Sequence, residues 1–139
     1  MWKQLMVLFG ILLLGLTFGC GEKYSDAIDV HEDFIDLASR YVADMDTADS
    51  AEKVAAAMNT YAEGIEAIAP RIRKINEKYP ELKDPDSVPE KLKQTSKEQT
   101  ALMQKVGSSF MKAMPYMRNP EVKNAQERIS KAMQGMAGR

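Results

Sequence analysis

Reactive side chains are scarce in this chain of 139 residues, which contains one cysteine, Cys20, and one histidine, His31. A cytochrome c-type haem site needs the motif C-x-x-C-H, and a di-iron bundle needs two Glu-x-x-His pairs, so neither can be built here. Zinc hydrolase motifs and glycine-rich phosphate loops are also missing. The sequence therefore predicts no catalytic residues, no enzyme activity and no cofactor.

A strong net charge is missing too, because the formal net charge at pH 7 is −1. Near neutrality disfavours nucleic acid as a partner. The charges are unevenly divided along the chain, however. Residues 21–69 carry 3 basic and 12 acidic side chains, whereas residues 70–139 carry 15 basic and 8 acidic ones.

The N-terminal residues have the order of charge and hydrophobicity that is typical of a secretory signal. Lys3 is followed by an uncharged apolar run over residues 5–16. This run is shorter than the ~20 apolar residues that a membrane-spanning helix needs. We therefore expect a signal peptide, with cleavage shortly after the run.

The end of this segment, Thr17-Phe18-Gly19-Cys20, resembles the lipobox of bacterial lipoproteins. Gly19 fits the family pattern, whereas Thr17 stands where leucine is usual and Phe18 where a small residue is usual. The resemblance implies that residues 1–19 are removed and that Cys20 is acylated. It also implies a lipidated tether over residues 20–23 and a folded domain over residues 24–139.

Ordinary signal cleavage and an uncleaved anchor remain alternatives at this point. A lone thiol in an exported protein needs a reason, and acylation of Cys20 supplies one. Gly21, rather than Asp, follows the cysteine. By resemblance to the enterobacterial sorting rule, this indicates the outer membrane, facing the periplasm.

Beyond the tether, apolar residues recur at steps of three and four in four segments. These segments cover residues 24–45, 51–79, 92–117 and 122–136. Such spacing predicts amphipathic helices, and no stretch shows the alternation of a strand. Candidate N-caps are Ser25, Asp49, Ser87 and Asn119. The pattern continues through Pro70, so the second segment is predicted to be one kinked helix.

Four helices with mainly short connections predict an all-α fold, an antiparallel four-helix bundle with up-down-up-down topology. In this topology, helices that follow each other in the chain are expected to pack side by side. A long central hairpin of two helices, with the other two packed on one of its sides, remains an alternative.

One constellation suggests a metal site. If the first two helices fold back about residues 47–49, His31 lies level with Gly64, and further folding brings Met103 and Met133 to the same layer. An imidazole with thioether sulfurs is a soft donor set that suits Cu(I). Met111, Met114 and Met117 add further sulfurs. The alternative is that these methionines fill the core and that His31 is a hydrogen-bonded core residue.

These observations favour a membrane-anchored lipoprotein of the cell envelope that acts as a helical binding or scaffolding module. It resembles the many small helical lipoproteins of bacteria whose activity is unassigned. The expected partners are the membrane, through the lipid on Cys20, and an envelope protein. The alternative is a periplasmic protein that binds a metal such as Cu(I), or a small ligand, inside the bundle.

Overall fold

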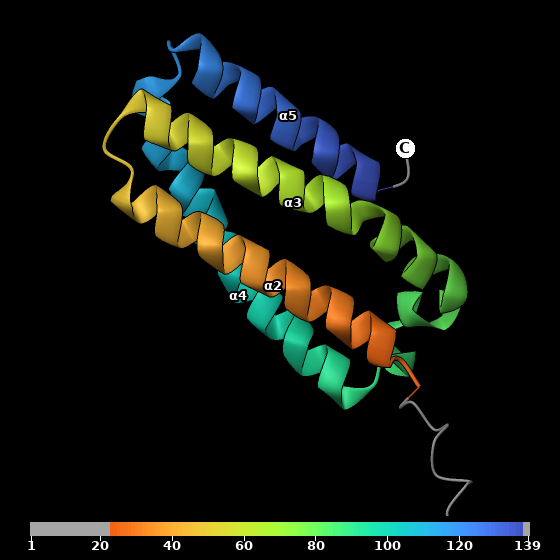
Figure 1. Cartoon of the computed structure of the whole chain (residues 1–139). Helices are drawn as coiled ribbons and strands as arrows, with labels where there is room; N and C mark the ends of the chain where they lie inside the picture. Colours follow the sequence, from red (N-terminus) through yellow and green to blue (C-terminus); the bar gives the residue numbers. More distant parts are fainter. Residues whose placement is uncertain (1–22, 138–139) are drawn as a thin grey trace, which may run out of the picture.

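A computed structural model describes residues 23–137, which form an all-α four-helix bundle (Figure 1). The long helices are α2 (Ser25–Thr47), α3 (Ala51–Lys78), α4 (Glu90–Ala113) and α5 (Pro120–Met136). Short 3₁₀ turns follow α3 and α4: η1 (Pro80–Lys83), η2 (Pro85–Ser87) and η3 (Met114–Tyr116). The predicted fold class is confirmed, and Pro70 lies inside the single helix α3, as the sequence pattern predicts.

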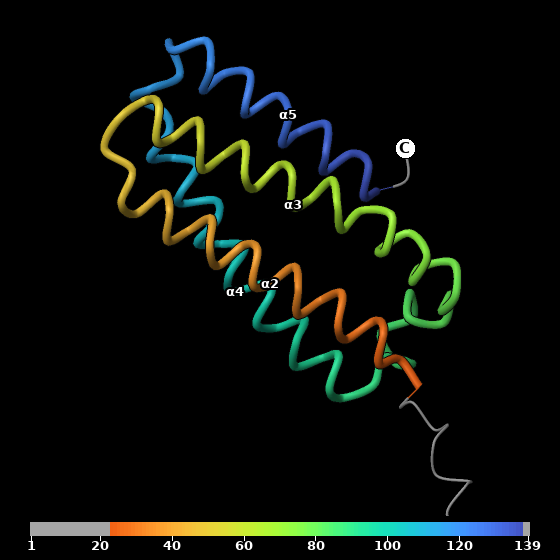
Figure 2. The backbone as a smooth tube through the Cα atoms, in the orientation of Figure 1, coloured from red at the N-terminus to blue at the C-terminus, as the bar shows by residue number. Residues whose placement is uncertain are grey.

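The chain direction alternates from each long helix to the next (Figure 2). The lateral order differs from the expected one, however. The principal helix contacts are α3 with α5, α2 with α3, and α2 with α4. Two of these three contacts, α3 with α5 and α2 with α4, therefore join helices that run in the same direction. Among the three, only α2 and α3 are consecutive in the chain and antiparallel. The η1–η2 connection carries the chain from the end of α3 to the start of α4, which packs on α2.

Charge complementarity explains why α4 packs on α2. Helix α2 contains seven acidic residues and one basic residue, whereas α4 contains five basic residues and two acidic ones. Lys112 of α4 donates to Asp46 of α2. On the other side, Arg128 of α5 holds Glu66 of α3 at 2.8 Å and Glu63 at 3.1 Å. The uneven charge of the sequence thus becomes pairing between an acidic first half and a basic second half.

Most of the largest fully buried side chains belong to α2 and α3. The rings of Tyr41 and Tyr61 stack with centroids 4.4 Å apart, and Phe110 of α4 contacts Tyr41 at 5.6 Å. About one turn of α3 beyond Tyr61, the absence of a side chain at Gly64 lets Leu37 of α2 come close to the α3 backbone. This hairpin provides the surface on which both other long helices pack.

The helix starts agree only partly with the predicted caps. Asn119 caps α5, because its Oδ1 accepts from the backbone N–H of Glu121 at 2.8 Å. The prediction of Asp49 is wrong by one residue, since Ser50 caps α3 and accepts from Lys53 N. The predictions of Ser87 and Ser25 are wrong as well: Pro89 precedes α4, and Ser25 is the first residue of α2 itself.

The predicted signal peptide over residues 1–19 and the acylated Cys20 lie outside the described residues. Within residues 23–137, none of the helices combines the length and the apolar character that crossing a bilayer requires.

The contact at Gly64 yields a prediction with a matched control. A Cβ at position 64 would lie 2.2 Å from Leu37 Cδ1 and 2.9 Å from Leu37 Cγ, so Leu37 must move. Gly64→Ala gains helix propensity of ~1 kcal/mol, but overpacking costs about 1–3 kcal/mol. We expect a net loss of about 1 kcal/mol in the free energy of unfolding, measured by urea denaturation.

Gly107 is the control, because nothing lies within 4 Å of a Cβ placed there. Gly107→Ala should raise the free energy of unfolding by about 0.5–1 kcal/mol. Equal stabilisation by both substitutions would show that α2 and α3 do not approach each other closely at Gly64.

Candidate functional site

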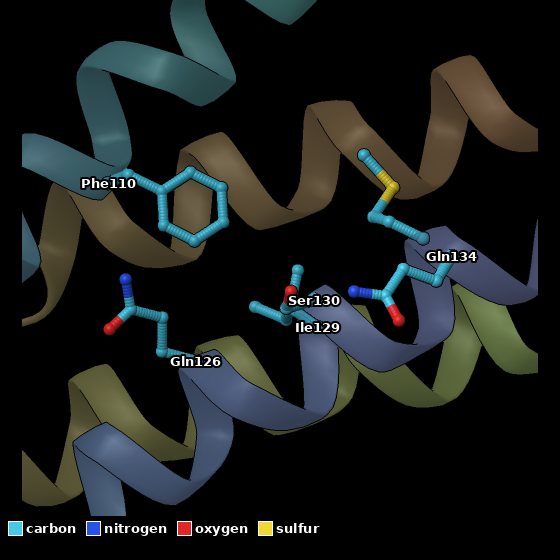
Figure 3. Close-up of a pocket in the computed structure, with 6 residues that line it drawn as sticks. Phe110, Gln126, Ile129, Ser130 and Gln134 are labelled. Carbon is cyan, nitrogen blue, oxygen red and sulfur yellow. The ribbon is translucent and has the colours of Figure 1, made fainter.

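The most prominent surface feature is an apolar groove between α4 and α5 (Figure 3). Its volume is about 550 Å³. Phe110 of α4 points into the groove, opposite Gln126, Ile129, Ser130 and Gln134 of α5. Met133 completes the lining. We call these six residues the α4–α5 groove.

The groove exists because α4 uses its small apolar surface against α2. The buried residues of α4 are Leu92, Thr95, Val106, Ser109 and Ala113, of which two are polar and one is small. Phe110 remains only partly buried. An α4 of this composition cannot cover α5 as well as α2, so the side of the bundle between α4 and α5 stays open.

The lining of the groove carries no formal charge. Ile129 is buried and Phe110 and Met133 are half-buried, so these three form the apolar surface. Gln126, Ser130 and Gln134 are exposed and follow one another at intervals of four residues along one edge. Apolar walls with a few polar groups at the rim are typical of a binding site for an apolar group, and a charged ligand would find no counter-ion here.

Two buried tyrosines lie behind this groove. The side chains of Tyr41 and Tyr61 are each 1% exposed, and neither hydroxyl has a hydrogen-bond partner among the described residues. Burial raises the pKa of Tyr61 to about 12, and it also raises the pKa of Tyr41, with a further contribution from Tyr61. Both side chains therefore remain neutral over the physiological pH range, and Tyr41 contacts Phe110 directly.

A second cluster joins the start of α2 to the end of α3, and we call it the start cluster. Tyr24 Oη donates to Glu81 at 3.0 Å, and Tyr79 Oη donates to Asp26 at 2.8 Å. The two tyrosine rings contact each other with centroids 4.8 Å apart. Lys78 lies 2.5 Å from Asp26 and, together with Tyr79, lowers the pKa of that carboxyl.

The backbone of Tyr24 has a φ of 77°, in the left-handed region that non-glycine residues seldom adopt. Lys23, the first described residue, forms an ion pair with Glu81 at 3.2 Å. The start cluster thus fixes the point at which the chain enters the bundle.

The residues of the predicted metal site are not brought together in one pocket. His31 lines a pocket with Ile72 and Ile75, whereas Met133 lines the α4–α5 groove, and Met103 lines neither. The predicted level of His31 beside Gly64 is wrong. Arg71 pairs with Asp33, two residues beyond His31, so His31 lies level with the last third of α3.

Met111 and Met114 are 68% and 60% exposed, so they do not add sulfur atoms to the interior. Within residues 23–137, no group of three or more His, Cys, Asp and Glu side chains could hold a metal ion. Copper binding by His31, Met103 and Met133 stays a prediction, and the pocket geometry does not support it.

Sequence reasoning did not identify the groove, because a closed bundle places Phe110, Ile129 and Met133 in the core. One signal was present in α5, where exposed positions 121, 123, 127 and 131 are charged but positions 126, 130 and 134 carry Gln, Ser and Gln. An uncharged polar row beside an apolar stripe is what the edge of an open groove requires.

Comparisons of the chain with protein-family models, with curated proteins and with solved structures found no match.

The buried tyrosines yield a prediction about stability. A buried hydroxyl without a partner costs about 1–3 kcal/mol, so Tyr61→Phe should raise the free energy of unfolding by about 1 kcal/mol at pH 8. In the unfolded chain Tyr61 loses its proton near pH 10, whereas in the folded protein it does so near pH 12. Stability that is fully present below pH 10 should therefore fall between pH 10 and pH 12.

Urea denaturation at pH 8 and at pH 11 measures both effects. The fall between these pH values should be smaller in Tyr61→Phe than in the wild type. Met114→Leu, at an exposed position without an ionisable group, should leave the fall unchanged. The same fall in Tyr61→Phe as in the wild type would contradict the assignment of the buried hydroxyl.

Proposed function

We propose that this chain is a bacterial lipoprotein, anchored by a lipid on Cys20, that holds a helical binding module at the cell envelope. The α4–α5 groove is its binding face. The observation that carries the proposal is this groove, an apolar surface that the bundle's own helices leave uncovered. Concave, mostly apolar surfaces with a few polar groups at the rim are where proteins commonly bind ligands.

The occupant we propose is an amphipathic helix of an envelope protein. The apolar wall of α5 runs along the stretch from Gln126 to Gln134. At 1.5 Å per residue this stretch is about 12 Å long, or roughly two helical turns. A helix laid in such a groove presents apolar side chains at i, i+3 or i+4, and i+7. The uncharged lining suits these side chains, and the amide groups at the rim suit the polar edge of such a helix.

The lipid anchor complements this binding face. Cys20 precedes Lys23 by three residues, a span of at most ~11 Å in a fully extended chain. Lys23 is itself paired with Glu81 in the start cluster. The bundle is therefore held with the start of α2 towards the membrane, while the groove lies along its side. Gly21 after the cysteine favours the outer membrane, facing the periplasm.

The anchor is tested by replacing its thiol. Cys20→Ser should abolish incorporation of labelled palmitate, because acylation requires the sulfur atom. The variant should also remain unprocessed or leave the membrane fraction. Metabolic labelling and membrane fractionation measure these outcomes, with Ser39→Ala, at an exposed position of α2, as a control that keeps the label. Labelling of Cys20→Ser at the wild-type level would refute the lipoprotein assignment.

The groove is tested by photo-cross-linking in intact cells. With a photoreactive phenylalanine at Gln126, we expect a cross-link to one envelope protein, at a segment whose apolar residues are spaced as in a helix. The same group at Thr60, an exposed position of α3 outside the groove, is the matched control.

Met133→Glu places a charge in the groove at a half-buried position and should reduce the cross-link at least fivefold. Circular dichroism checks that this variant keeps its helices. A cross-link only between copies of this chain, or one that Met133→Glu leaves unchanged, would contradict a partner helix in the groove.

A further inference from the structure

A second pocket lies on another side of the bundle, where α2, the last third of α3 and the first half of α4 meet. Its volume is about 140 Å³. Val30, Phe34, Ile72 and Ile75 form its apolar walls. Val30, Phe34 and Ile75 are buried, so the inner part of the pocket is shielded from water. We call it the His31 pocket.

Three polar side chains, one from each helix, complete the lining: His31 of α2, Asn76 of α3 and Gln99 of α4. His31 and Gln99 are half-buried and Asn76 is exposed, which places the polar groups at the mouth of the pocket. The lining includes no Asp, Glu, Lys or Arg. An ionised ligand would therefore lose hydration without gaining an ion pair.

The tautomer of His31 follows from its only hydrogen bond among the described residues. Nδ1 lies 2.7 Å from the carbonyl oxygen of Ala27, one turn earlier in α2. A carbonyl oxygen only accepts, so Nδ1 carries the proton and donates it to this bond. In the neutral ring Nε2 is then an acceptor with a free lone pair. Within residues 23–137 neither Nε2 nor the amides of Asn76 and Gln99 make a hydrogen bond.

The size of the pocket limits the ligand. An apolar protein cavity of about 150 Å³ binds a molecule of benzene. The His31 pocket is therefore large enough for one six-membered aromatic ring and too small for a fused or substituted drug-sized molecule. Phe34 offers an aromatic contact, and Ile72 and Ile75 offer aliphatic ones.

The polar groups define the remaining chemistry. An acceptor at His31 Nε2 calls for a hydroxyl donor, and the amide N–H groups of Asn76 and Gln99 can donate to the oxygen of that same hydroxyl. We infer that the His31 pocket binds a small neutral phenol, with the ring against Phe34 and the hydroxyl donating to His31 Nε2. This function is additional to the α4–α5 groove and does not depend on it, because the two sites share no lining residue.

The test uses 4-fluorophenol and fluorobenzene as probes, followed by ¹⁹F NMR with the purified full chain in detergent. We expect 4-fluorophenol to bind saturably, with one probe per chain. Fluorobenzene has the same ring without the hydroxyl, so it should bind about tenfold more weakly. Probe that dissolves in the micelles does not saturate and is subtracted with protein-free detergent.

Three variants locate the binding site. His31→Phe removes the acceptor. It should weaken the binding of 4-fluorophenol about tenfold and change the affinity for fluorobenzene less than about twofold. Ile72→Phe fills the pocket and should abolish saturable binding of both probes. Met133→Ala, in the α4–α5 groove, should leave both affinities unchanged. Circular dichroism establishes that each variant is folded before it is compared.

Several outcomes would overturn the inference. Non-saturable binding to the wild type would mean that the pocket holds only water. Equal affinity for both probes, or an unchanged affinity of His31→Phe, would refute the hydrogen bond to Nε2. If Met133→Ala lost the binding of 4-fluorophenol and Ile72→Phe retained it, the probe would bind in the α4–α5 groove instead.

Discussion

The close contact between α2 and α3 determines where the other helices can lie. Gly64 allows Leu37 to approach the α3 backbone, and the stacked rings of Tyr41 and Tyr61 join the two helices about one helical turn away. Most of the largest fully buried side chains belong to this hairpin. Interiors are close-packed, so a hairpin this tight has a fixed shape. Helices α4 and α5 pack on opposite edges of that shape, and neither has a comparable contact with the other.

Electrostatic complementarity determines which edge of the α2–α3 hairpin each helix packs on, although it contributes little to the free energy of unfolding. Exposed ion pairs contribute about 0–1 kcal/mol each, so Asp46–Lys112 and the pairs of Arg128 add little to stability. These pairs favour the packing of α4 on α2 over its packing on α3, because α4 is basic and would place like charges against the second half of α3. The apolar surface of α4 is then used on α2, and on the side facing α5 Phe110 stays only half-buried. The open groove follows from this distribution of charge and apolar area.

The sequence predicted the helices well and their lateral arrangement poorly. The three-four spacing of apolar residues is a strong local signal, and it located all four long helices and the continuity of α3 through Pro70. The N-cap positions were predicted less accurately than the helices. Neighbouring Asp49 and Ser50 are both good caps, and only the backbone geometry selects Ser50. The prediction that His31 lies beside Gly64 was wrong, because the turn geometry after α2 shifts the register of α2 against α3. The groove could not be predicted, because it depends on which edge of the hairpin α4 occupies, and the short-loop rule for neighbouring helices favours a closed bundle.

Helix α4 borders both candidate sites, through Gln99 at the His31 pocket and Phe110 at the α4–α5 groove. It is also the long helix whose packing is weakest, since its buried residues include Thr95 and Ser109 and its first half is mostly polar. Regions with few buried apolar contacts are those in which small shifts cost least free energy. A ligand that contacts Gln99 would hold the first half of α4 against α2 and α3, and a helix in the groove would contact the second half. Because α4 is one continuous helix from Glu90 to Ala113, a shift in its position would reach both sites. Thermodynamic linkage then requires that each ligand change the affinity for the other by the same factor.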